Sequence, residues 1–90
     1  MTEKIAELDG YELHATPFGY RVEEPETNYD HTSHGMLTIA LDNTIGVVTT
    51  SSSNRNPAAV AEYARALLTA TKVANYFQAV IDDHQENNNA

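Results

Sequence analysis

The sequence predicts an α+β fold: a four- to five-stranded antiparallel sheet of hairpins with one long C-terminal helix packed on one face. Three observations lead to this. Two turn signals, Asp9-Gly10 and Asp42-Asn43-Thr44, each separate two runs with strand-like alternation. No helix breaker interrupts residues 57–84. All expected strands precede the helix, an order typical of an antiparallel sheet covered on one side.

The first expected hairpin joins residues 5–8 to residues 11–14 through Asp9-Gly10. A two-residue type I′ turn needs positive φ at both central positions, which Asp-Gly supplies. Leu8 should then pair with Tyr11, and Ala6 with Leu13. Period two places one set of side chains on the inner face (Ala6, Leu8, Tyr11, Leu13, Ala15) and another on the outer face (Ile5, Glu7, Glu12, His14). The competing interpretation is a short helix over residues 2–8.

The next expected strand covers residues 20–23, after a turn at Thr16-Pro17-Phe18-Gly19. Its alternation turns Tyr20 and Val22 inward. Residues 25–35 then form a long polar loop, N-Y-D-H-T-S-H-G included.

The clearest hairpin pairs residues 36–41 with residues 45–50. A three-residue loop with Asn43 or Thr44 near the left-handed region would pair Leu41 with Ile45. The buried face would then hold Leu37, Ile39, Leu41, Ile45, Val47 and Thr49. Ala40 and Val48 are apolar on the opposite face, which favours a central position in the sheet.

The helix should begin with Asn56 as its cap and Pro57 at its first position, and run to about His84. Residues 1–84 then form one domain, followed by a disordered polar tail at 85–90. The apolar stripe turns by roughly 100° near Thr69–Lys72. Either the helix is kinked there, or its second half packs on another chain. The second option predicts a homodimer through Val73, Tyr76, Phe77, Val80 and Ile81.

Composition narrows the function. The chain has no cysteine, no apolar stretch near the ~20 residues of a membrane span, and no signal-peptide pattern, so a cytoplasmic location is expected. Net charge is −8, and eight of the thirteen acidic residues lie within residues 1–30. Five scattered Lys and Arg residues are too few for direct nucleic-acid binding, and anionic membranes are disfavoured. A basic protein surface would be attracted, although acidity also serves solubility.

Metal binding has weak candidates in His14, His31, His34 and Asp30. His31 and His34 lie on a loop, which lacks the rigidity that gives such a spacing meaning on a helix, so a solvated loop is favoured. No nucleophile elbow or Gly-rich phosphate loop is present. The sequence therefore predicts neither an enzyme nor a cofactor.

The expected partner site is an acidic face that comprises Glu7, Glu12, Glu23, Glu24, Glu26 and Asp30. The favoured function is a small acidic non-enzymatic interaction module that acts on a basic protein. Its concrete version is a phage- or prophage-type inhibitor, for example an anti-CRISPR protein or a nucleic-acid mimic, an analogy of size and charge. One alternative is an assembly subunit that homo-oligomerises through its C-terminal helix. The second is a histidine-based metal-binding module.

Overall fold

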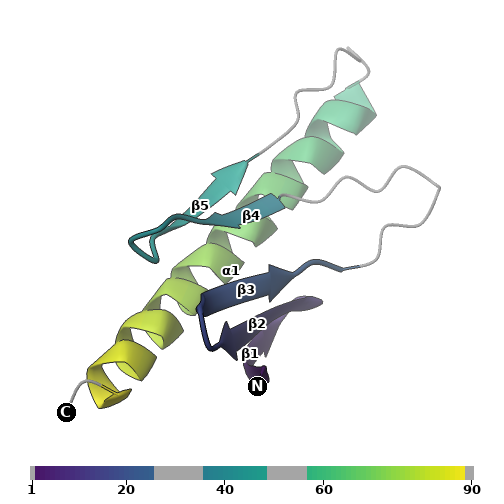
Figure 1. Cartoon of the computed structure of the whole chain (residues 1–90). Coiled ribbons are helices and arrows are strands. Elements are labelled where there is room, and N and C mark those ends of the chain that lie inside the picture. The colour runs from purple at the N-terminus through teal and green to yellow at the C-terminus, as the bar shows by residue number, and fades with distance from the viewer. Residues whose placement is uncertain (1, 26–35, 49–56, 89–90) are drawn as a thin grey trace.

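The computed structural model describes residues 2–25, 36–48 and 57–88 (Figure 1). Its elements are β1 (Glu3–Leu8), β2 (Tyr11–Thr16), β3 (Gly19–Glu23), β4 (Met36–Ile39), β5 (Ile45–Val48) and α1 (Pro57–Asn88). The α+β class is therefore confirmed. Several predicted positions lie outside the described residues, among them Glu26, Asp30, His31, His34, Thr49 and Asn56.

The single sheet of four to five strands is not confirmed, because the described strands form two sheets. One has the order β1-β2-β3 and the other consists of β4 and β5, all antiparallel. Strands β3 and β4 lie side by side without a hydrogen-bonded ladder (Figure 1). A short turn fixes the register of each hairpin, whereas the connection from β3 to β4 is too long to do so.

The first hairpin has the predicted register, with Leu8 opposite Tyr11 and Ala6 opposite Leu13. Its turn residues Asp9 and Gly10 have φ angles of 51° and 87°, as a type I′ turn requires. One prediction is wrong here. Ile5 packs against the core rather than standing on the outer face, because the register shifts between Lys4 and Ala6 and leaves Ile5 as the extra residue of a β-bulge.

The β4–β5 connection is longer than predicted. Ile39, not Leu41, pairs with Ile45, and Leu41 projects fully into solvent. Asn43 takes the left-handed conformation (φ 65°), and the backbone N–H of Asn43 donates to the carbonyl of Ala40 over 2.9 Å. These contacts close a five-residue loop, so the buried face ends two residues earlier than alternation alone suggests.

The core forms where one stripe of α1 meets both sheets. Its fully or nearly fully buried members are Tyr11, Leu13, Leu37, Ala70, Val73, Ala74, Phe77 and Ile81. Partly buried residues from β1, β3, β4, β5 and α1 pack around them, including the predicted inward pair Tyr20 and Val22. The Tyr20 hydroxyl and Nδ1 of His84 share a hydrogen bond of 2.7 Å, which ties β3 to the C-terminal part of α1.

The helix is unbroken through Thr69–Lys72, where the sequence allows a kink. The Thr71 hydroxyl donates to the Leu67 carbonyl over 2.8 Å, an arrangement compatible with a continuous helix. The helix also extends to Asn88, four residues past its predicted end, and Asn87 donates to Asp83 on its last turns. Its N-terminal part extends beyond the strands (Figure 1), and Val60, Leu67 and Leu68 are exposed there.

Most residues of the predicted dimer interface pack into the core of a single chain, while the homodimer itself stays a prediction. Val73, Phe77 and Ile81 have no exposed area within a single chain, and Val80 packs against the same core. Only Tyr76 keeps a large exposed fraction, 46%. The buried helix residues recur at spacings of three and four, so one face of α1 carries them all into the core, and the small Ala70 and Ala74 let the sheets approach closely. No helix among the described residues is long and apolar enough to cross a bilayer.

Replacement of Phe77 by alanine should lower the free energy of unfolding by about 3–5 kcal/mol, because the ring is completely buried and would leave a cavity. Leu41→Ala is the matched control and should change stability by less than about 0.5 kcal/mol. Urea unfolding followed by circular dichroism measures both. Near-equal effects of the two substitutions would contradict the described core.

Candidate functional site

The outer face of the β1-β2-β3 sheet carries two rows of charged side chains that cross all three strands. In one row Glu7 lies opposite Glu12, and Glu12 lies opposite Glu23. In the neighbouring row Lys4 lies opposite His14, and His14 lies opposite Arg21. We call these the acidic row and the basic row. Alternation explains their position, since Leu13 and Val22 between them point into the core.

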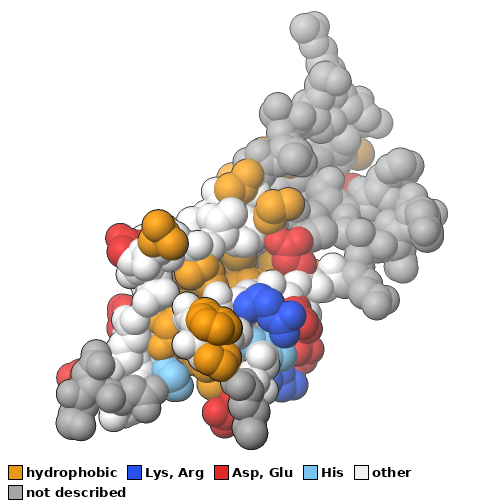
Figure 2. Space-filling view, viewed as in Figure 1, with side chains coloured by type: hydrophobic (Ala, Val, Ile, Leu, Met, Phe, Trp, Pro, Cys, Tyr) orange, Lys and Arg blue, Asp and Glu red, His pale blue; other side chains and the backbone are white. Residues whose placement is uncertain are grey.

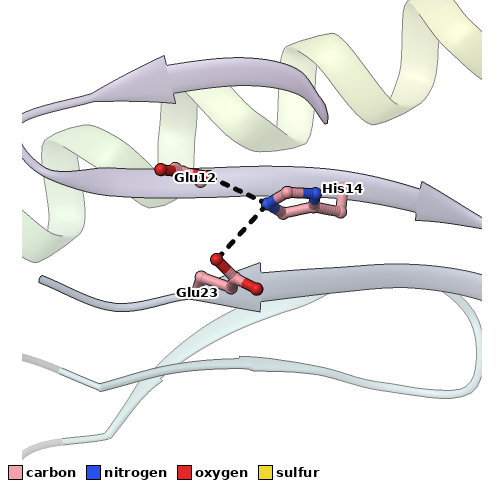
Figure 3. A group of neighbouring side chains, drawn as sticks. All are labelled: Glu12, His14 and Glu23. Atoms are coloured by element: carbon pink, nitrogen blue, oxygen red, sulfur yellow. Dashed lines mark hydrogen bonds and ion pairs between the residues drawn. The ribbon is translucent and has the colours of Figure 1, made fainter. Parts of the chain in front are cut away.

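His14 is the centre of this face (Figure 3). Its Nε2 lies 3.0 Å from Oε1 of Glu12 and 3.6 Å from Oε2 of Glu23. Because a carboxylate only accepts, this contact places the proton of a neutral His14 ring on Nε2. The His14 side chain is 13% exposed, against 49% for Glu23, so the imidazole lies beneath a more open carboxylate.

Two further ion pairs link the rows. Arg21 Nη2 lies 3.0 Å from Oε1 of Glu23, and Lys4 Nζ lies 3.0 Å from Oε2 of Glu7. The hydrogen bond from Lys4 to Glu7, followed by the charges of Glu7 and Glu12, raises the pKa of the Lys4 ammonium. The two outer carboxylates of the acidic row are thus each held by a neighbouring cation, and the middle one by His14.

The acidic row is costly in isolation, since like charges directly opposite one another on a sheet are destabilising. The ion pairs with the basic row offset this cost only weakly, because exposed pairs are worth about 0–1 kcal/mol. Lys or Arg side chains of a partner could therefore replace Lys4 and Arg21 in these ion pairs with little loss of free energy. The face is chemically suited to bind positive charge.

The same face could hold a divalent cation. One ligand atom from each of Glu12, His14 and Glu23 lies within 4.8 Å of the others. Zinc bonds of ~2.1 Å place tetrahedral ligand atoms about 3.4 Å apart, and the two His14 distances bracket that value. Arg21 holds Oε1 of Glu23 and leaves Oε2 directed at His14, as an outer partner of a metal ligand does.

The structure brings together residues that the sequence analysis assigned to two different sites, the acidic face and the metal set. Glu7, Glu12 and Glu23 of the predicted acidic face lie together, and His14 of the predicted metal set lies among them. Glu24 is not part of the cluster of Glu12, His14 and Glu23; after burial, its negative charge is the second cause that raises the pKa of the Tyr11 phenol. Glu26, Asp30, His31 and His34 lie outside the described residues.

Sequence reasoning missed that Glu12 and Glu23 surround His14. The signal was present in two parts. Glu12-x-His14 puts both side chains on one strand face, and a two-residue turn at Pro17-Phe18 sets Glu12 opposite Glu23.

A scan against protein-family models finds no match, and comparisons with curated proteins and with solved structures find none either. The function of this chain is therefore inferred from its own geometry.

Arg21→Gln should lower the free energy of unfolding by about 0.2–1 kcal/mol at low ionic strength, because Glu23 loses its cation while it still faces Glu12. The difference should shrink in about 1 M NaCl, where exposed charges are screened. Urea unfolding at the two salt concentrations measures it. A salt-independent difference would show that Arg21 acts through packing of its side chain instead.

Proposed function

We propose that this chain is a non-enzymatic interaction protein that binds a basic surface of another protein through the outer face of β1-β2-β3. The observation that carries the proposal is the acidic row, Glu7, Glu12 and Glu23, aligned across three neighbouring strands. Neighbouring strands lie about 4.8 Å apart, so the backbone positions that carry these carboxylates form a regular row on a face that the helix does not cover.

The net charge of −8 supports this proposal, because it favours encounter with a positively charged partner. A row of neighbouring carboxylates presents a series of negative charges, as the phosphates of a nucleic-acid strand do. The concrete form is therefore an inhibitor that occupies a groove made for nucleic acid, as an anti-CRISPR protein or nucleic-acid mimic of phage origin would. We place such a protein in the cytoplasm.

A neutralised triple variant tests this proposal: Glu7→Gln, Glu12→Gln and Glu23→Gln. Proteins captured from a lysate of the organism that carries the gene are quantified by mass spectrometry. A specific basic protein should be captured by the wild type and lost by about tenfold or more in the variant, since several charge pairs disappear together. Capture should also weaken steeply between about 0.1 M and 0.5 M salt.

The matched control removes three acidic charges elsewhere: Glu62→Gln, Asp83→Asn and Glu86→Gln on α1. It has the same net charge as the first variant and should retain the captured protein. Equal loss in both triple variants would mean that only overall charge matters, and retention in both would overturn the proposal.

A second candidate function is divalent metal binding, favoured by the clustered ligand atoms of Glu12, His14 and Glu23. Isothermal titration of the untagged chain with Zn²⁺ should show one bound ion per chain. His14→Asn should abolish that heat, because the cluster loses its single nitrogen ligand.

The matched control for the zinc site is the double variant His31→Asn and His34→Asn, which should bind as the wild type does. Loss of binding in the double variant, with retention in His14→Asn, would assign zinc to the segment at 31–34 instead.

A further inference from the structure

Two hairpin ends lie next to each other on one side of the molecule: the β2–β3 turn and the β4–β5 loop (Figure 1). A Cβ built on Gly19 would lie 3.9 Å from Oδ1 of Asn43, so the two ends are in near contact. Each presents one large apolar side chain to solvent. Phe18 is 100% exposed and Leu41 is 107% exposed, and hydrophobic side chains project from this part of the surface in Figure 2. Neither side chain contributes to the core.

The turn that carries Phe18 is firmly built. Pro17 fixes one backbone angle, and Gly19 adopts a φ of 142° that other residues rarely take. The Thr16 hydroxyl accepts a hydrogen bond from the Phe18 N–H over 3.1 Å and donates one to the Gly19 carbonyl over 3.2 Å. The backbone beneath the exposed ring is therefore held in one conformation.

The loop that carries Leu41 is braced both internally and by the helix. The Ala40 N–H donates to the Thr44 carbonyl over 2.9 Å, and the Thr44 N–H donates to Oδ1 of Asp42 over 3.0 Å. Gln78 of α1 then spans the loop: its Nε2 donates to the Asn43 carbonyl over 3.1 Å, and its Oε1 accepts from the Ile45 N–H over 2.8 Å. A loop fixed in this way holds its apolar tip without further ordering.

Negative charge borders the two tips. Asp42 follows Leu41 and is ionised at neutral pH, as an ordinary aspartate is; hydrogen bonds from Thr44 lower the pKa of its carboxyl group further. Asp82 accepts a hydrogen bond from Gln78 over 3.2 Å and so lies on the loop side of α1. Neither carboxylate takes part in an ion pair within the described parts of the chain.

We propose that Phe18 and Leu41 form a paired anchor that inserts into an apolar pocket of a partner protein, whose rim offers Lys or Arg side chains to Asp42 and Asp82. Exposed apolar side chains on ordered backbone bind at low entropic cost, and aromatic anchors in pockets dominate interface energies. The bordering carboxylates select a basic rim and oppose an anionic membrane. The anchor lies on a different part of the surface from the acidic row. Its only link to the proposed function is that both proposals name a protein as the partner.

Site-specific photo-cross-linking tests the anchor. Benzoylphenylalanine replaces Phe18, Leu41 or, as an exposed aromatic control on α1, Tyr76 in the full chain, and far-UV circular dichroism confirms that each variant folds. After illumination in a lysate of the organism that carries the gene, positions 18 and 41 should yield adducts with the same protein, at least about tenfold above position 76. The cross-linked partner peptide should contain apolar residues flanked by Lys or Arg.

Second substitutions separate the contributions. With the cross-linker at position 18, Leu41→Ser should reduce the adduct about tenfold, as should Asp42→Lys together with Asp82→Lys. Neutralising Glu7, Glu12 and Glu23 in the same background tells the two proposals apart. Adducts that survive neutralisation of the acidic row support the anchor, even if the acidic row binds nothing. Adducts that are lost on neutralisation, but retained in Leu41→Ser and in Asp42→Lys with Asp82→Lys, support the acidic row alone.

Three outcomes would overturn the anchor. Adducts between two copies of this chain would show that the tips self-associate. Co-sedimentation with phosphatidylcholine vesicles, abolished by Phe18→Ser, would show that they enter lipid. Equal yields at positions 18, 41 and 76 would show that the tips contact no specific partner.

Discussion

Burial of one helix stripe against both sheets is the constraint on which the rest of this structure depends. Among the described strands no ladder joins the two sheets, so their relative position depends on side-chain packing. Val73, Phe77 and Ile81 of the helix are completely buried against the two sheets, and the small Ala70 and Ala74 let the sheets approach the helix closely. Each large apolar group buried in this way contributes about 1.5–3 kcal/mol, more than any exposed ion pair of the chain. Helix packing therefore sets the position of both sheets.

This packing also determines which surfaces remain available. Because α1 covers one face of β1-β2-β3, alternation sends Glu12, His14 and Glu23 to the open face, where cross-strand register brings them together. The same helix braces the β4–β5 loop through Gln78 and so holds Leu41 beside the turn of Phe18. A charged face and an apolar tip are thus both rigidly presented, and neither is needed for the core.

Local chemistry made part of this predictable. Asp9-Gly10 specifies both turn and register, and alternation along the hairpin turns Tyr11 and Leu13 toward the core. The predictions that were wrong concern positions set by contacts that strand alternation does not include. The bulge at Ile5 and the five-residue loop that exposes Leu41 each shift a strand by contacts that alternation does not encode. Val73, Phe77 and Ile81 of the expected dimer face are buried within one chain, because a long helix with an apolar second half can pack that face on its own sheets; the homodimer itself stays a prediction.

Native-state amide hydrogen exchange tests this account most directly. Helix amides at 70–84, which lie over both sheets, should exchange only through global unfolding and so be the slowest in the chain. Amides at 60–67, where Val60 and Leu67 are exposed, should exchange faster by at least about two orders of magnitude through local opening. Uniform protection along α1, increasing with protein concentration, would instead show that a second chain covers the N-terminal half and would contradict a fold organised by one buried stripe.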